Sequence, residues 1–576
     1  ATDFRVANGA TDVELTAALE QAETGDVIFI DGWVTLNAPV HIAKNVTIKA
    51  GVDNAGFDGE GKTRLFDLEP EPIDGAKLVF DNLGFMNGDA RQTEADGDGG
   101  AARIFSGVVD FVLCYFDSNQ ARRGGAFFIV KNADAPAGPV VTFKKCEATN
   151  NLAAGGAGES RGGYLFTDGD AHITHEYCNI SANQAIGGRG GALCLFGAGT
   201  RRLYYTVLSS NKGGDWDENG IIGEGEYEGG LAFITGGATT FESCGIVDNK
   251  SWSHAGLIRG WGDVNTTVTF INSTIAKNQS MTNKPPMWIG GDATYTFVNS
   301  LFVENIGSNA GNGAGFDIDG GNMKLKIFNS VFARNACASN EGAVDISGGS
   351  NKATQITVKN SLIGLIKGDD SGIVPVDNPN IPTKSNIRMY RIANEDAQPD
   401  YSLLENSGID FSEGIKWSKL YDMPYYLLTN GSTVTKLGDP ALLADYDLNT
   451  DLFEQTRTPA ADGSISAAPT LASTVADFDD TDFGTTGIVS PKVSLLKENI
   501  RIIGTVSNGI LGLDFSNLRG QATGTLIDLT GREVEKVFNQ IVVGKGYYDI
   551  HATPGIYILK VDIGGKTYAQ KLIVTQ

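Results

Sequence analysis

The chain has no long apolar run, few cysteines and a shortage of basic residues. It contains no run of about 18 apolar residues, which excludes a transmembrane helix, and no signal peptide is visible. Six cysteines in 576 residues are too few for a disulfide framework. With 45 basic and 69 acidic residues the net charge is −24. This charge excludes nucleic acid as a partner, because such binding depends on neutralising phosphates.

Helical periodicity is also nearly absent between about residue 30 and residue 365. Instead, an asparagine recurs on average about every 31 residues, and a small or polar residue precedes it by five positions. The asparagines are Asn87, Asn119, Asn151, Asn183, Asn211, Asn249, Asn278, Asn305 and Asn335. The preceding residues are Asn82, Cys114, Cys146, Cys178, Thr206, Cys244, Ser273, Ser300 and Ser330. A repeat of this length indicates a solenoid.

Each repeat is built from short strands. Apolar and polar side chains alternate in Val141-Thr-Phe-Lys-Lys-Cys146, which is typical of a strand with one buried face. Glycine pairs such as Gly124-Gly125 and Gly162-Gly163 bound the strands. The absence of helices excludes a doubly wound α/β fold, and the period is too short for propeller blades. We therefore predict an all-β parallel β-helix over residues 41–370.

Parallel stacking predicts what the recurring residues do. Neighbouring coils lie about 4.8 Å apart, so equivalent side chains stand directly above one another. A buried asparagine amide can then donate to one neighbouring coil and accept from the other. Cys114, Cys146 and Cys178 would form a buried stack of free thiols that act as small apolar fillers, with oxidation in pairs as the alternative.

The ends of the chain differ from the repeats. Residues 1–40 read as an N-terminal cap that contains a short amphipathic helix. Residues 371–485 read as the last coils and a C-terminal cap, and a linker follows at about 477–492. Residues 495–576 contain amphipathic strands joined by glycine turns, which predicts a small Ig-like β-sandwich.

Three parts of the sequence resemble known families. The repeats with Gly-Gly pairs and column asparagines resemble the right-handed β-helices of the pectate-lyase superfold and the repeats of chlamydial polymorphic outer-membrane proteins. The segment that begins Leu437-Gly-Asp-Pro resembles the ends of bacterial surface β-helices of the choice-of-anchor Q type. Residues 495–576, with Leu526-Ile-Asp-Leu-Thr-Gly-Arg, closely resemble the C-terminal sorting domain of type IX secretion cargo in Bacteroidetes. The last resemblance implies the type IX machinery as a partner and a secreted or surface-attached protein. A generic adhesion-type β-sandwich is the alternative.

Three arginines form the most unusual candidate site. Arg123, Arg161 and Arg189 each stand just before a Gly-Gly pair, and Glu228 takes the same place in the next repeat. Coils in register would align the three guanidinium groups, whose repulsion is roughly 1 kcal/mol per pair at 4 Å in water. Either nearby carboxylates pair with these arginines, or the row binds carboxylate or sulfate groups of an acidic polysaccharide.

Aromatic and acidic residues extend this candidate site. An inserted loop at 213–228 carries several carboxylates and two aromatic rings, and three tryptophans fall on the following coils. We predict that this set binds sugar: Trp216, Asp217, Tyr227, Trp252, Trp261 and Trp288. The alternatives are a solvated acidic loop and core packing of the tryptophans. A Ca²⁺ site is predicted where oxygen ligands alternate, at Asp445, Asp447, Asn449 and Asp451.

Catalytic signatures are missing. The sequence lacks the Asp-Asp and Gly-His-Gly motifs of polygalacturonases, and it lacks the Trp-x-Asp-His and Arg-x-Pro-x-x-Arg motifs of pectate lyases. A lyase that uses an isolated arginine or lysine as its base would escape such a search. Three hypotheses therefore stand: an exported surface protein that binds polysaccharide, a lyase or glycoside hydrolase acting on an acidic glycan, and a non-catalytic adhesin or structural surface protein.

Overall fold

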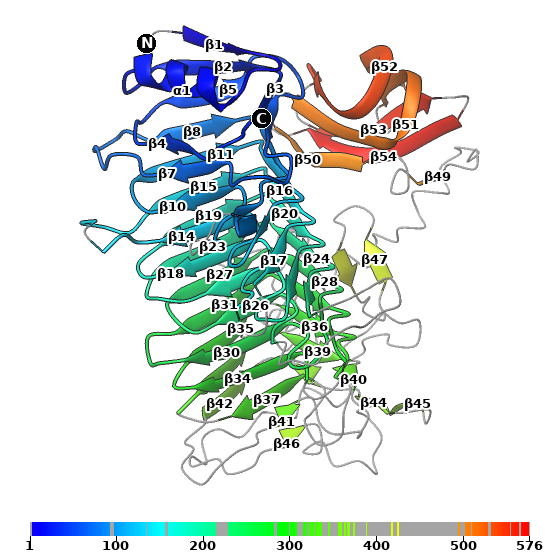
Figure 1. The fold of residues 1–576 in the computed structure, drawn as a ribbon. Helices are drawn as coiled ribbons and strands as arrows, with labels where there is room; N and C mark the ends of the chain where they lie inside the picture. The colour runs from blue at the N-terminus through cyan, green and yellow to red at the C-terminus, as the bar shows by residue number, and fades with distance from the viewer. Residues whose placement is uncertain are drawn as a thin grey trace.

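The chain folds into a right-handed parallel β-helix followed by a separate antiparallel β unit (Figure 1). The computed structural model describes residues 3–92, 97–133, 135–155, 159–214, 228–281, 285–298 and 300–307. It also describes parts of 315–374, short strands at 387–388, 416–418 and 423–425, and most of 494–574. Most of the predicted C-terminal cap, the linker and the predicted Ca²⁺ ligands, at 375–386, 389–415 and 426–493, lie outside the described residues.

Within the described residues, three long parallel sheets run the length of the β-helix, and each coil contributes one strand to each. Sheet A contains β1 (Asp3–Ala7), β2 (Val27–Asp31), β5 (Thr47–Ala50), β8 (Leu78–Asp81), β11 (Val108–Val112), β15 (Val140–Lys144), β19 (His172–Glu176), β23 (Thr200–Tyr204), β27 (Ala238–Glu242), β31 (Thr267–Ile271), β35 (Thr294–Val298), β38 (Lys324–Phe328) and β42 (Gln355–Lys359). Sheet B contains β3 (Trp33–Thr35), β6 (Gly56–Asp58), β9 (Gly84–Met86), β12 (Tyr115–Asp117), β16 (Glu147–Thr149), β20 (Asn179–Ser181), β24 (Val207–Ser209), β28 (Gly245–Val247), β32 (Thr274–Ala276), β36 (Leu301–Val303), β39 (Val331–Ala333) and β43 (Leu362–Ile363).

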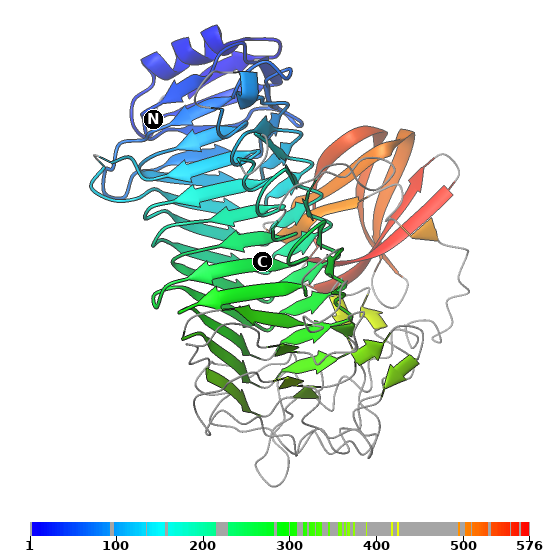
Figure 2. The same ribbon diagram turned by 60° about the horizontal axis from the view of Figure 1, so that its bottom comes forward.

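The third long sheet is sheet C, and among the described residues a shorter sheet D is formed only by coils in the middle of the β-helix. Figure 2 shows the stacked strands from a second direction. Sheet C contains β4 (Val40–Ile42), β7 (Phe66–Leu68), β10 (Ala102–Ile104), β14 (Phe127–Val130), β18 (Leu165–Asp168), β22 (Leu193–Leu195), β26 (Ala232–Ile234), β30 (Ile258–Gly262), β34 (Met287–Gly291), β37 (Phe316–Asp319), β41 (Val344–Asp345) and β46 (Ile387–Arg388). Sheet D contains β13 (Gln120–Ala121), β17 (Leu152–Ala154), β21 (Gln184–Ile186), β25 (Lys212–Gly213), β29 (Lys250–Ser251) and β33 (Gln279–Ser280). Short strands follow at β40 (Asn335–Ala336), β44 (Ile366–Gly368), β45 (Gly372–Val374), β47 (Lys416–Ser418) and β48 (Met423–Tyr425).

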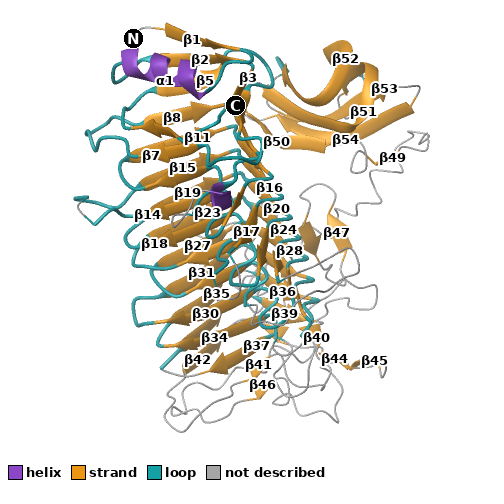
Figure 3. Cartoon of the chain, viewed as in Figure 1, coloured by secondary structure: helices purple, strands orange, loops and turns teal. Residues whose placement is uncertain are grey.

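The predicted N-terminal helix is α1 (Asp12–Gln21), which lies at one end of the solenoid (Figure 3). Thr11 caps it, and the Glu14 carboxylate accepts from the Thr11 backbone N–H, which completes a capping box. Leu15 and Leu19 are buried in the same core as the first strands. Strands β1 to β4 already belong to sheets A, B and C, so parallel stacking begins before residue 41.

Stacked rings fill the interior along sheet A. Phe80, Phe111 and Phe143 lie face to face, with centroids 5.2 Å and 5.1 Å apart. His175 continues this stack at 4.7 Å from Phe143, and its Nε2 lies 3.1 Å from the Tyr164 hydroxyl. Burial lowers the pKa of His175 to about 3, so its imidazole is neutral in the folded protein. His175 therefore belongs to the core.

The predicted asparagine ladder is confirmed from Asn119 to Asn335. The Nδ2 atom of each member donates to the Oδ1 atom of the next, as from Asn151 to Asn183 at 2.9 Å. Asn87 was wrongly placed in this column: the Asn119 amide oxygen accepts from the backbone of Gly88, and Asn87 has a left-handed φ of 52°. Asn82, at φ 57°, likewise stands one residue before the small-residue column. Asparagine tolerates this left-handed backbone, which explains the error.

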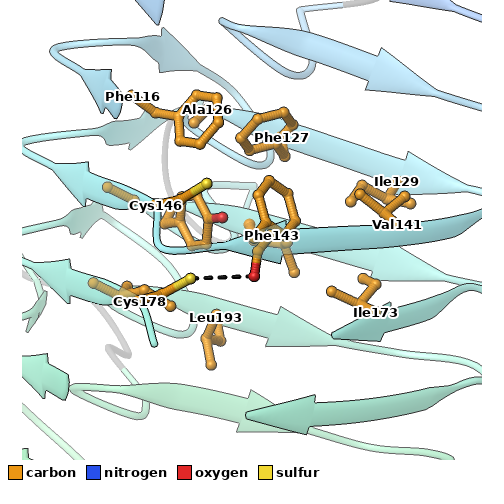
Figure 4. Packing of buried hydrophobic residues seen from close by; sticks show 14 of the residues in the cluster. Phe116, Ala126, Phe127, Ile129, Val141, Phe143, Cys146, Ile173, Cys178 and Leu193 are labelled. Carbon is orange, nitrogen blue, oxygen red and sulfur yellow. Dashed lines mark hydrogen bonds between the residues drawn. The ribbon is translucent and has the colours of Figure 1, made fainter. Parts of the chain in front are cut away.

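The cysteine column is buried and its thiols are free (Figure 4). Each sulfur lies against a backbone carbonyl one coil away, as Cys178 Sγ does to the Phe143 oxygen at 3.3 Å. Burial and the neighbouring thiols raise the pKa of Cys146 well above its ordinary value. The prediction of stacked thiols that act as small fillers is therefore confirmed.

The C-terminal strands form a mainly antiparallel sheet with a core of its own, in which β54 pairs in parallel with β49 and β50. Its elements are β49 (Ser494–Leu495), β50 (Arg501–Ser507), β51 (Ile510–Ile527), β52 (Glu533–Asp549), β53 (Gly555–Ile563) and β54 (Lys566–Val574). Strand β51 pairs with β50 through its first part and with β53 through its last part, and its register with β52 shifts between Phe515 and Arg519. The predicted strands are confirmed, and burial alternates along β53 from Tyr557 to Ile563. The Ig-like sandwich arrangement stays a prediction.

Candidate functional site on sheet C

Glycine pairs bring one column of side chains into register at the edge of sheet C. Gly162 has a φ of 67°, and a Cβ atom on Gly163 would lie 2.2 Å from the Gly191 carbonyl oxygen, so neither position accepts a side chain. The residue before each pair therefore stacks on its neighbours. Parallel bridges join Asp98, Arg123, Arg161, Arg189, Glu228 and His254 in this order. We call Arg123, Arg161 and Arg189 the arginine row.

The arginine row covers a column of outward-facing aromatic rings on sheet C. The strand register aligns Phe128, Phe166, Cys194 and Phe233. The rings of Phe128 and Phe166 stack at 5.2 Å. Beside the small Cys194, Phe196 fills the gap, with its centroid 5.6 Å from Phe166 and 5.7 Å from Phe233. We call Phe128, Phe166, Phe196 and Phe233 the aromatic column.

The guanidinium groups lie on these rings. Arg123 is 4.8 Å from the centroid of Phe128, Arg161 is 5.5 Å from Phe196, and Arg189 is 4.7 Å from Phe233. Such cation–π contacts contribute about 0.5–2 kcal/mol each. They hold the arginine side chains flat on the sheet and shield the outward-facing rings from water.

Buried carboxylates neutralise both ends of the row. The Arg123 guanidinium donates twice to Asp98, at 2.6 Å and 3.0 Å, and this hydrogen bonding raises the pKa of Arg123. The Nε atom of Arg189 forms an ion pair with one Glu228 carboxylate oxygen at 2.9 Å, and the Nε atom of Arg259 is 3.7 Å from the other. Asp98 and Glu228 are 4% and 6% exposed. Carboxylate pairing, one of the two alternatives from the sequence, thus holds for Arg123 and Arg189.

Arg161, in the middle of the row, differs from both neighbours. Among the described residues no carboxylate lies within ion-pair distance of it, and its Nε atom is buried without a hydrogen-bond partner. The arginines of the two adjacent coils flank it in register. Two unpaired cations would repel Arg161 by roughly 1 kcal/mol each in water. Asp98 and Glu228 offset the charges of Arg123 and Arg189, so only part of this repulsion remains. An anion that binds here would remove that repulsion.

The tryptophans predicted to bind sugar lie in different surroundings. Trp288 is covered by the His254 ring, whose centroid is 5.0 Å away, and by Arg259 at 3.6 Å. Trp252 is half-buried in the turn that leads to His254. Trp261 is 44% exposed and lies 5.3 Å from the Arg259 guanidinium. Trp216, Asp217 and Tyr227 lie outside the described residues.

The described residues contain neither a cluster of metal-binding side chains nor a membrane-spanning helix. No group of three or more histidine, cysteine or carboxylate side chains within them could hold a metal ion. No helix in that part of the chain is both long and apolar enough to span a bilayer. The proposed Ca²⁺ ligands Asp445, Asp447, Asn449 and Asp451 are outside it, so that prediction is untested.

Several residues of the site were not predicted from the sequence. Asp98, Arg259 and the aromatic column were all missed, although the chain carries a signal for them. The fifth residue after Arg123 is Phe128, and the fifth after Arg161 is Phe166. The same offset leads from Glu228 to Phe233. This spacing spans the glycine turn and ends on the first outward-facing residue of sheet C.

Comparison with known proteins gives no assignment: no protein-family model matches the chain, and no curated protein matches it.

Proposed function

We propose that this protein is an exported surface β-helix that binds an acidic polysaccharide at the arginine row. The observation that carries the proposal is Arg161, a half-buried guanidinium that has no carboxylate partner among the described residues and lies between two arginines that do. A carboxylate or sulfate group accepts two parallel hydrogen bonds from a guanidinium, which makes arginine well suited to this task.

The negative charge of the whole chain restricts where an acidic polysaccharide can bind. A net charge of −24 repels polyanions over most of the surface. Around the row there are five arginines: Arg122, Arg123, Arg161, Arg189 and Arg259. The buried carboxylates Asp98 and Glu228 pair with four of them, and Glu159 and Asp168 also attract Arg123, so one positive charge is in excess among these described residues. An acidic chain would therefore be attracted to this edge of sheet C and to little else.

Binding assays with Arg161→Ala test the proposal. We expect the variant to bind polyuronates or sulfated glycans about 10- to 100-fold more weakly, since hydrogen bonds to a charged group contribute about 1.5–3 kcal/mol. The matched control is Arg202→Ala, which removes an exposed arginine paired with Glu242 on sheet A. Calorimetry over a panel of acidic and neutral glycans measures both. Equal affinity in wild type and Arg161→Ala would contradict the proposal, as would the absence of binding to any acidic glycan.

The same panel separates binding from catalysis. An absorbance assay for unsaturated uronides detects a lyase, and a reducing-sugar assay detects a hydrolase. Product formation that Arg161→Ala abolishes would favour the lyase or glycoside hydrolase over a binding protein.

For residues 495–576 we propose the role of a type IX sorting domain that directs the protein to the cell exterior. The antiparallel strands β50 to β54 and their own buried core support an independent terminal unit, and the resemblance to type IX cargo supplies the role. Deletion of residues 495–576 in a type IX-competent bacterium should leave the β-helix inside the cell. Fractionation and immunoblotting measure this, and unchanged export would contradict the assignment.

A further inference from the structure

Trp261 is a second feature of the sheet C surface that points to a ligand. It is more exposed than Trp33, Trp252 and Trp288, and the coil beyond it places Gly290 opposite, without a side chain. The neighbouring Trp288 is covered by His254 and Arg259. Covering the apolar surface of this nearly half-exposed indole would release free energy, so a ligand that stacks on the ring would be stabilised there.

Trp261 lies on the same outward column as Phe196, the ring beneath the Arg161 guanidinium. The register pairs Leu195 with Ile234 and Ile234 with Gly260, and one residue further it aligns Phe196, Thr235 and Trp261. Two coils separate the two rings, which is about 10 Å along the solenoid axis. A linear ligand parallel to the axis would therefore meet the Arg161 cation first and the Trp261 indole next.

The net charge differs between the two places. Arg161 has no carboxylate partner among the described residues, whereas Arg259, which lies 5.3 Å from the Trp261 ring, is 3.7 Å from a Glu228 carboxylate oxygen. Arg161 lies between two other arginines. Near Trp261 the following turn carries Asp263, which is fully exposed and whose pKa is lowered by hydrogen bonds from the backbone of Asn265 and the hydroxyl of Thr266. Asp263 is therefore ionised at neutral pH. It disfavours an acidic sugar on the indole and leaves a neutral sugar free to stack there through its C–H face.

We propose that the ligand is a linear heteropolysaccharide that runs along the solenoid axis, with an acidic sugar at Arg161 and a neutral sugar stacked on Trp261. This inference rests on the proposed function, because it takes Arg161 as the anion subsite. It adds the class of ligand, a chain with both acidic and neutral sugars, and the direction in which that chain lies.

The test uses the full chain and three probes: free glucuronate, oligosaccharides that alternate glucuronate with an N-acetylated amino sugar, and a pure polyuronate. We expect Trp261→Ala to bind the alternating oligosaccharides about tenfold more weakly, with Trp261→Phe restoring most of the affinity. Glucuronate alone is too short to reach the indole, so its affinity should not change. Val264→Ala, at a 70% exposed residue in the same turn, is the matched control and should bind as the wild type does.

Salt dependence separates failure of this inference from failure of the proposed function. Exposed ionic contacts are screened by salt, and stacking is not. Trp261→Ala should keep the wild-type slope of affinity against ionic strength, whereas Arg161→Ala should flatten it.

If Trp261→Ala binds every probe as tightly as the wild type while Arg161→Ala does not, the neutral subsite is wrong and the anion site stands. If the pure polyuronate binds more tightly than the alternating oligosaccharides, the proposed ligand class is wrong. If Arg161→Ala changes nothing, both proposals fail.

Discussion

Replacing Asn183 with leucine should destabilise the coils around it by about 2–4 kcal/mol. In the folded chain its Nδ2 atom donates to Asn211 Oδ1 at 3.0 Å and to the Ala148 oxygen at 3.0 Å. Its Oδ1 atom accepts from Asn151 twice, from Nδ2 at 2.9 Å and from the backbone N–H at 3.1 Å. Leucine has nearly the same size but can make none of these bonds.

The size of this destabilisation follows from the buried polar groups that Asn183→Leu leaves without a hydrogen-bond partner. The Asn151 backbone N–H loses the acceptor that Asn183 supplies, in a fully buried column. An orphaned buried donor costs about 1–3 kcal/mol, and the lost amide–amide bonds add to this. Because each coil contacts only its neighbours, the loss should stay local. Amide hydrogen exchange should therefore quicken at Asn151 and in the adjacent coils, and the urea midpoint should fall.

Asn150→Ala is the matched control for this experiment. Asn150 is exposed, has a left-handed φ of 56°, and its counterpart one coil later is Ala182 at φ 55°. The fold therefore already accepts alanine in this conformation, and we expect a change below about 1 kcal/mol. If Asn183→Leu leaves both the urea midpoint and the exchange rate at Asn151 unchanged, the amide ladder contributes no stability and the reasoning is refuted.

Two further predictions concern the interior. The pKa of His175 is about 3 in the folded protein, below its ordinary value of 6.5. Its contribution to the free energy of unfolding is therefore complete above pH 6.5. As the pH falls from 6.5 toward 3, the free energy of unfolding decreases by about 1.4 kcal/mol per pH unit. Urea unfolding at pH 7 and pH 4.5 should show a smaller loss for the double variant His175→Phe, Tyr164→Phe than for the wild type; equal losses would mean that His175 does not set this dependence. The buried thiols of Cys146 and Cys178 should react with a thiol reagent only after unfolding, because burial raises the pKa of Cys146. Rapid labelling of the native protein would contradict their burial.

Much of the fold was determined by the sequence alone. The spacing of the asparagines and cysteines, and the glycine pairs, report contacts between neighbouring coils, and in a solenoid those contacts are the fold. The alignment of Arg123, Arg161, Arg189 and Glu228 followed from the same spacing, and the parallel bridges confirm it. The offset of Asn87 shows the limit, since asparagine suits both the ladder and the left-handed turn beside it.

Only the tertiary structure decided which member of the arginine row has no carboxylate partner among the described residues. Asp98 reaches Arg123 from the coil before it, and Glu228 reaches Arg189 from the coil after it. No repeat pattern shows these pairs, because each carboxylate occurs once and its reach depends on the length of the loop between coils. The same holds for the tryptophans: His254 and Arg259 cover Trp288, while a glycine on the next coil stands opposite Trp261. A periodic sequence determines which residues stack, but the side chains that interrupt the period decide which of them stay open to a ligand.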